Sequence, residues 1–158
     1  MNHEAMGALV TRYAAAKSRQ DVDAALDCCT QDMLLYTEGF HVTARGAANV
    51  RRQLDYFFKV FPDYGVVLDG SAINDYGLVC WGAVRMTMKG RIGFWAPTGR
   101  TMALPFFCLF TFDGGKLASE KFFFSQEQMC RQLGLPHAAF RRLARLASFL
   151  PVRLQVMF

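Results

Sequence analysis

The sequence predicts an α+β domain in which N-terminal helices pack on one face of a curved antiparallel sheet. In the first part of the chain, apolar residues recur at helical spacing. Further along, they alternate with a period of two between short turn sequences. A length of 158 residues fits one domain with a buried core. Helices followed by a run of strands are typical of this architecture.

Three helices are expected before the main run of strands. The first covers about residues 4–18, and the second begins after Asp21, a good N-cap residue. The third follows Gly46 and ends at Pro62, because proline cannot continue a helix. Their apolar stripes are Met6, Leu9, Val10 and Tyr13; Val22, Ala25, Leu26 and Cys29; and Val50, Leu54, Phe57, Phe58 and Phe61.

One short strand is expected over Met33–Glu38, and four longer strands follow the third helix. The turns between them contain Asn74-Asp75-Tyr76-Gly77, Pro97-Thr98-Gly99 and Asp113-Gly114-Gly115. The four strands cover residues 64–74, 78–89, 101–112 and 116–124. The last strand runs into a short helix that ends at Gly134.

Composition limits the class of protein. Apolar residues make up 53% of the chain, which excludes a disordered protein, and no apolar run reaches the roughly 20 residues of a membrane span. The N-terminus lacks the pattern of a secretory signal, so a cytoplasmic protein is expected. The five cysteines form no C-x-x-C pair and no metal-ligand pattern, which indicates reduced thiols and no metal site.

The net charge of +5 does not indicate a nucleic-acid partner. The arginines at 131, 141, 142, 145 and 153 all lie near the C-terminus, and the rest of the chain is close to neutral. A local basic segment is more often a solvated helix face than a nucleic-acid footprint.

Pro136 separates a domain of residues 1–135 from a C-terminal segment of residues 136–158. The segment should form a cationic amphipathic helix over residues 137–150, stopped by Pro151. We favour a helix packed on its own domain or across a dimer. The helix could also close one end of a pocket. Attachment to an anionic membrane surface is the alternative. The predicted apolar face is Ala139, Phe140, Leu143, Leu146, Ala147 and Leu150.

Four short motifs occur in order along residues 5–135: a helix pair over residues 15–26, Phe61-Pro62-Asp63, Pro97-Thr98-Gly99-Arg100 and Gln132-Leu133-Gly134. Together they resemble the SnoaL-like polyketide cyclase and ester cyclase group of the NTF2-like superfamily. The resemblance implies a cone-shaped α+β barrel with an internal pocket and no cofactor. It also implies a homodimer through the outer face of the sheet.

The resemblance also implies where catalytic groups should stand. In the SnoaL-like pattern an acidic general acid/base precedes the closing helix, and a histidine often stands in an earlier strand. These positions hold Ser125 and Met88 here. Neither side chain can act as a base near neutral pH, so Ser125 is expected to bind rather than catalyse.

Glu38 and His41 are the alternative acid/base candidates. They lie near the end of the first predicted strand, which the resemblance places near the cavity. A carboxylate and an imidazole at the mouth of a cavity could act as an acid/base couple. The structural interpretation, a solvated loop, is favoured because strand ends are commonly charged.

An apolar pocket is the main functional expectation. Strand alternation puts Met86 and Met88 on one face and Arg85 on the other, toward the outer sheet surface. Such a pocket suits a hydrophobic polycyclic or terpenoid-like small molecule. We keep two hypotheses: a cyclase or isomerase-type enzyme, and a non-catalytic protein that binds a small molecule or a partner. The predicted lining is Tyr36, Phe57, Phe61, Met86, Met88, Phe123 and Ser125.

Overall fold

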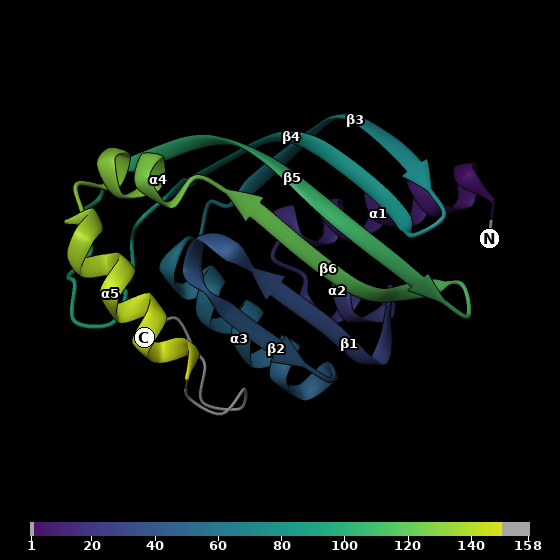
Figure 1. Ribbon diagram of the computed structural model, residues 1–158, viewed down its shortest axis with the longest axis horizontal. Helices are drawn as coiled ribbons and strands as arrows, with labels where there is room; N and C mark the ends of the chain where they lie inside the picture. The colour runs from purple at the N-terminus through teal and green to yellow at the C-terminus, as the bar shows by residue number, and fades with distance from the viewer. Residues whose placement is uncertain (1, 150–158) are drawn as a thin grey trace.

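The protein folds as a curved six-stranded sheet with helices on its inner side and at one end (Figure 1). The computed structural model describes residues 2–149. The strand order is β2-β1-β6-β5-β4-β3. The predicted α+β class is therefore confirmed.

The three N-terminal helices form close to where the sequence places them. They are α1 (His3–Ser18), α2 (Val22–Asp27) and α3 (Ala47–Val60). Asp21 is the N-cap of α2, and its side chain accepts a hydrogen bond from the Ala24 amide, as expected for a capping aspartate. Helix α1 contacts β3, and α3 contacts β1 and β2, so these helices cover the inner face of the sheet.

The four long strands also match the prediction. They are β3 (Gly65–Asn74), β4 (Gly77–Thr87), β5 (Thr101–Asp113) and β6 (Lys116–Phe124), joined as antiparallel neighbours. Two further helices follow: α4 (Gln126–Leu133), which ends at Gly134 in the left-handed conformation, and α5 (His137–Ser148).

The first part of the sheet differs from the prediction. Strand β1 (Cys29–Thr37) starts earlier than expected and pairs in parallel with β6, so the sheet is mixed. Cys29 therefore opens a strand rather than continuing a helix. A short 3-10 helix, η1 (Glu38–Phe40), and strand β2 (Val42–Arg45) follow. Four residues carry too little periodic signal for β2 to be predicted.

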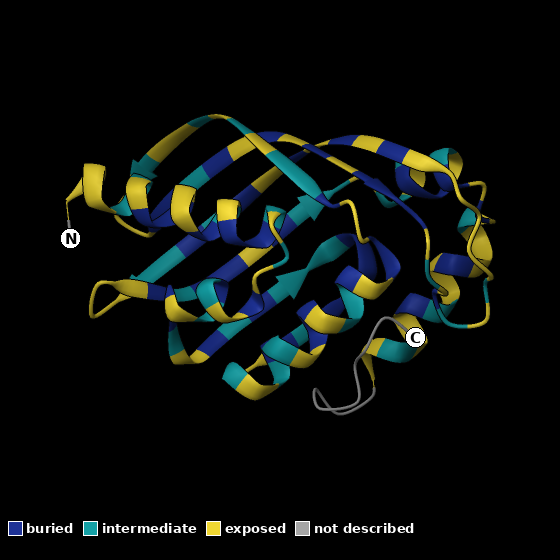
Figure 2. Ribbon diagram, turned by 180° about the vertical axis from the view of Figure 1, so that it is seen from behind, coloured by how far each residue is buried: buried dark blue, intermediate teal, exposed yellow. Residues whose placement is uncertain are grey.

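Alternating burial along β4 and β5 defines two faces of the sheet (Figure 2). In β4, Cys80, Val84 and Met86 are buried, whereas Trp81 and Arg85 are exposed. The predicted alternation in this strand, with Arg85 on the outer face, is confirmed.

Helix α5 packs on its own domain, next to α4 and β2 at the end of the molecule away from the N-terminus (Figure 1). Phe140 is fully buried, and its ring stacks on Trp95 at 5.3 Å. The predicted apolar face is partly wrong, because Ala139 and Leu146 are exposed and Ala144 is buried instead. Leu150 and the segment after it lie outside the described residues. Within residues 2–149, none of the helices has the length and apolar character needed to cross a membrane.

Candidate functional site

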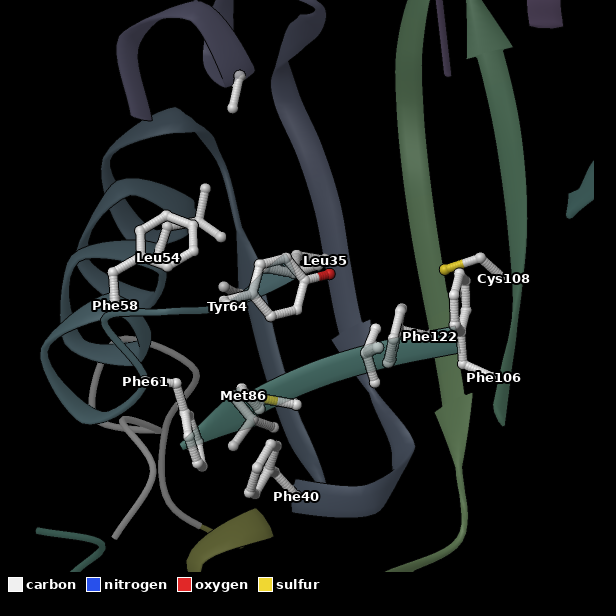
Figure 3. Close-up of a cluster of buried hydrophobic side chains, with 14 of the residues drawn as sticks. Leu35, Phe40, Leu54, Phe58, Phe61, Tyr64, Met86, Phe106, Cys108 and Phe122 are labelled. Atoms are coloured by element: carbon white, nitrogen blue, oxygen red, sulfur yellow. The ribbon is translucent and has the colours of Figure 1, made fainter. Parts of the chain in front are cut away.

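A mostly apolar cavity lies between α1, α3 and the inner face of the sheet. Figure 3 shows six of the side chains that line it: Leu35, Phe40, Leu54, Tyr64, Met86 and Phe122. Its empty volume is about 480 Å³, part of which is continuous with solvent. Within the cavity, the packed side chains leave only a narrow empty space. Polar groups are few among the lining residues, which are Lys17, Leu35, Thr37, Phe40, Gln53, Leu54, Phe57, Tyr64, Met86, Glu120, Phe122 and Phe124.

A buried ion pair joins two distant parts of the chain at this cavity. The Lys17 ammonium lies 2.8 Å from Glu120 Oε1 and 3.1 Å from Oε2. The Tyr13 hydroxyl donates a 2.6 Å hydrogen bond to Glu120 Oε2. Glu120 is 1% exposed and Lys17 is 7% exposed. Charges are buried at such depth only when they are paired and hydrogen-bonded.

The electrostatics keep Lys17 charged. Burial is the largest single influence and disfavours the ammonium form, but the Glu120 carboxylate and the neighbouring Tyr64 and Cys108 together outweigh it, so the pKa of Lys17 lies above its usual value. The Lys17 ammonium also lies 5.0 Å from the centre of the Tyr13 ring. A lysine that stays protonated cannot serve as an amine nucleophile, so covalent chemistry through Lys17 is disfavoured.

Burial also raises the pKa of neighbouring hydroxyl and thiol groups. The pKa of Tyr64 rises to about 12, chiefly because of burial, with Lys17 opposing the effect. Burial and the Glu120 charge raise the pKa of the Cys108 thiol well above its usual range. These side chains are therefore neutral at physiological pH, and Tyr64 remains a hydrogen-bond donor.

Local sequence explains why these charged side chains point inward. Lys17 stands four residues after Tyr13, so both lie on the same buried stripe of α1. Glu120 alternates with Phe122 and Phe124 on the inner face of β6. This pair was not predicted from the sequence, although Lys17 continues the apolar stripe of α1 and Glu120 continues the alternation of β6.

Part of the predicted lining is found in the cavity. Met86 and Phe57 both contact it. Phe61 does not line the cavity, contrary to the expectation, although its ring lies 5.2 Å from that of Phe57. Helix α3 and the inner face of β4 supply Phe57 and Met86, as expected.

Ser125 and Met88 do not line the cavity. Ser125 is exposed at the N-cap of α4, where its hydroxyl accepts a hydrogen bond from the Gln128 amide. Met88 is fully buried beyond the end of β4, near the Thr98 hydroxyl. The expectation that these two side chains share the pocket is wrong, because the chain has left the sheet at both positions.

Tyr36 and Phe123 lie on the opposite face of the sheet from the cavity. Their rings meet edge to face at 6.4 Å, and Phe123 stacks on Phe107 at 5.0 Å. The expectation that Phe123 lines the cavity is therefore wrong, because β6 turns the other face of its alternation inward. Glu120, Phe122 and Phe124 occupy the inner face instead.

Glu38 and His41 are half-buried near the end of β1, and neither lines the cavity. Glu38 belongs to η1 and accepts a hydrogen bond from the Tyr36 hydroxyl. His41 adopts a left-handed backbone conformation with φ of 50° at the end of η1. The backbone amide of His41 donates a hydrogen bond to the carbonyl oxygen of Glu38, and neither residue lines the cavity with Glu120.

Among residues 2–149, no group of three or more histidine, cysteine, aspartate or glutamate side chains is arranged to hold a metal ion. Lys17 and Glu120 are the charged groups of the cavity lining. The chemistry that this arrangement offers is proton transfer and hydrogen bonding in an apolar surrounding.

Comparison with known proteins identifies the family. The model of the SnoaL-like domain matches residues 10–120. A comparison with curated proteins finds no match. Solved structures share the fold at low sequence identity.

A candidate SnoaL-like polyketide cyclase from Jannaschia sp. CCS1 is 16% identical, with a TM-score of 0.75 over 84% of this chain and 94% of its own. A candidate polyketide cyclase from Xanthomonas campestris pv. campestris is 18% identical, with a TM-score of 0.75 over 84% and 99%. AclR, a candidate hydroxylase from Streptomyces galilaeus, is 19% identical, with a TM-score of 0.71 over 93% and 94%. The family match over most of the chain leads to one conclusion, which the shared fold supports: the chain belongs to the SnoaL-like domain family.

Proposed function

We propose that the protein is a cyclase or isomerase-type enzyme that moves a proton on a hydrophobic small molecule, with Glu120 as the base. One observation carries the proposal: a carboxylate, paired with a protonated lysine, borders a mostly apolar cavity. Family membership and the candidate polyketide cyclases among the structural neighbours support this class of reaction. A polycyclic or terpenoid-like molecule is the proposed substrate.

The proposed step starts from a carbon acid next to a carbonyl group. The Glu120 carboxylate takes the proton, and the electrons of the broken C–H bond form an enolate. Once Glu120 is protonated, the Lys17 ammonium can turn to the enolate oxygen and stabilise its negative charge. Glu120 then returns the proton to the product at a different carbon. Alternatively, the enolate attacks a second carbonyl and closes a ring, and Glu120 gives the proton to the alkoxide that this attack forms.

Solvent exchange of carbon-bound protons tests this role directly. Neutral polycyclic ketones with acidic α-protons would be incubated with the protein in D2O and followed by NMR. The wild type should accelerate the exchange, and Glu120→Gln should lose the acceleration by a factor on the order of 10²–10⁴. Glu38→Gln is the matched control, because Glu38 does not line the cavity. If Glu38→Gln abolished the exchange and Glu120→Gln did not, the base would be Glu38.

A non-catalytic binding protein is the second candidate. The position of the family acid/base holds Ser125, which caps a helix, and both oxygens of Glu120 already have partners. This candidate predicts that hydrophobic ketones bind in the cavity with no exchange above the background rate. Parallel measurement of binding and exchange separates the two functions.

A further inference from the structure

Two polar side chains in the cavity have no hydrogen-bond partner within the described part of the chain. Gln53 on α3 is 6% exposed, and Tyr64, just before β3, is 5% exposed. Both line the cavity, and neither side chain hydrogen-bonds to any residue among 2–149. Among the described residues, Thr30 Oγ1 is the one fully enclosed side-chain polar atom without a partner, so the polar atoms of Gln53 and Tyr64 are open to the cavity, where a ligand can satisfy them.

The hydroxyl of Tyr64 points into the interior from the side of α3 (Figure 3). Burial raises the pKa of Tyr64 to about 12, so the hydroxyl keeps its proton. The amide of Gln53 offers both an acceptor and two donors. Together they can hold a carbonyl or a hydroxyl oxygen, which no apolar residue of the lining can do.

The charges of the lining limit what else the ligand can carry. Lys17 and Glu120 are the two charged residues there, and their charges cancel. A carboxylate ligand would bring a negative charge into an apolar cavity whose single ammonium already has a carboxylate partner. Such a charge has a high desolvation cost without compensation. The cavity therefore favours a neutral molecule.

We propose that the ligand is a neutral, largely apolar molecule with a carbonyl or hydroxyl oxygen that hydrogen-bonds to Gln53 and Tyr64. The inference rests on the proposed function, since it concerns the same cavity, and it specifies the chemical class of ligand. The narrow space requires the partly buried rings of Phe57 and Phe124 to move as a ring-sized ligand enters.

Equilibrium binding of three matched probes tests the proposal. The probes are 2-acetylnaphthalene, which is a neutral ketone, 2-ethylnaphthalene, which lacks the oxygen, and the 2-naphthoate anion. The wild type should bind the ketone about tenfold more tightly than the hydrocarbon, as expected for one or two buried hydrogen bonds. It should bind the anion more weakly than the ketone.

Variants assign the preference to named side chains. Gln53→Leu should remove most of the ketone's advantage and leave affinity for the hydrocarbon unchanged or higher, and Tyr64→Phe should act in the same direction. Gln31→Leu, at an exposed position of β1, is the control and should behave as the wild type. Unfolding curves would confirm that each variant is folded before its binding is compared.

Equal affinity for the ketone and the hydrocarbon, tighter binding of the anion, or no binding of any probe would each overturn the proposal. An unchanged preference in Gln53→Leu and Tyr64→Phe would overturn the assignment to these residues. Selective binding without proton exchange would leave the ligand class intact and reject catalysis by Glu120. Proton exchange without selective binding would leave catalysis by Glu120 intact and reject the proposed ligand class.

Discussion

At the scale of single residues, the Lys17–Glu120 pair is the most consequential feature of the interior. Its net stabilising effect is not large in principle, because desolvation offsets much of the attraction. Its importance is that neither charge can be buried alone. The same pair supplies the charged side chains of the cavity lining within the described residues.

Removal of one partner should therefore be costly. Lys17→Met leaves the Glu120 charge uncompensated and should lower the free energy of unfolding by about 3–5 kcal/mol, measured by urea denaturation. The double variant Lys17→Met/Glu120→Met should recover most of this loss, because it removes both charges. A double variant no more stable than the single one would show that the pair does not act as a unit.

The raised pKa values predict a loss of stability at alkaline pH. Lys17, Tyr13 and Tyr64 all have folded-state pKa values above their unfolded values. Their stabilising effect is complete below the unfolded pKa values, near pH 10, and is lost as the pH rises further. Above pH 10 the free energy of unfolding should fall by up to about 1.4 kcal/mol per pH unit for each group.

The pH dependence can be assigned by substitution. Tyr64→Phe removes one titrating group, so its unfolding free energy should fall less steeply between about pH 10 and pH 12, where Tyr64 titrates only in the unfolded chain. Denaturant unfolding at several pH values gives the slope. An identical slope in the wild type and the variant would contradict a raised pKa at Tyr64.

At the scale of elements, the junction of β6 and α4 explains why the family position at Ser125 has no role in the cavity. Strand β6 ends at Phe124, and Ser125 begins the turn into α4. Its side chain is committed to the helix N-terminus, where serine is one of the preferred residues. The residue that reaches the cavity from this strand is Glu120.

Substitution of Ser125 should accordingly affect stability and not binding. Ser125→Ala removes the bond to the Gln128 amide and should lower the free energy of unfolding by about 1 kcal/mol. Ser125→Asp keeps a capping oxygen and should retain the stability of the wild type. Reduced ketone binding by Ser125→Ala, with stability unchanged, would instead place Ser125 in the site.

At the scale of the whole molecule, the outer face of the sheet carries a row of aromatic side chains. Trp81, Phe107 and Phe123 are consecutive cross-strand partners on β4, β5 and β6. Trp81 is 44% exposed and Phe107 is 53% exposed. Large exposed apolar side chains in one row are typical of a surface that contacts another protein.

We expect this row to form a homodimer interface, as the family resemblance also implies. Trp81→Arg and Phe107→Arg together should convert the protein into a monomer, measured by sedimentation velocity over a range of concentrations. Tyr76→Arg is the control, because Tyr76 is 81% exposed in the turn between β3 and β4. A wild-type protein that remains a monomer at every concentration would contradict the interface.

The regular elements of the fold could be predicted because they depend on local chemistry. Interactions within a few residues determine the helical spacing of α1 and α3, the Asp21 cap, and the turns at 74–77 and 113–115. The alternation in β4 also predicted correctly that Met86 faces inward and Arg85 outward. These patterns, with the four short motifs, were sufficient for the fold class and the family.

The composition of the site depended on tertiary structure. Alternation divides β6 into two faces but does not say which one meets the cavity, so Phe123 and Ser125 were assigned to it in place of Glu120. The ion pair joins residues 103 positions apart, and the parallel pairing of β1 with β6 is equally non-local. Contacts of this range arise from the packing of whole elements, and a single sequence records only which faces are able to take part.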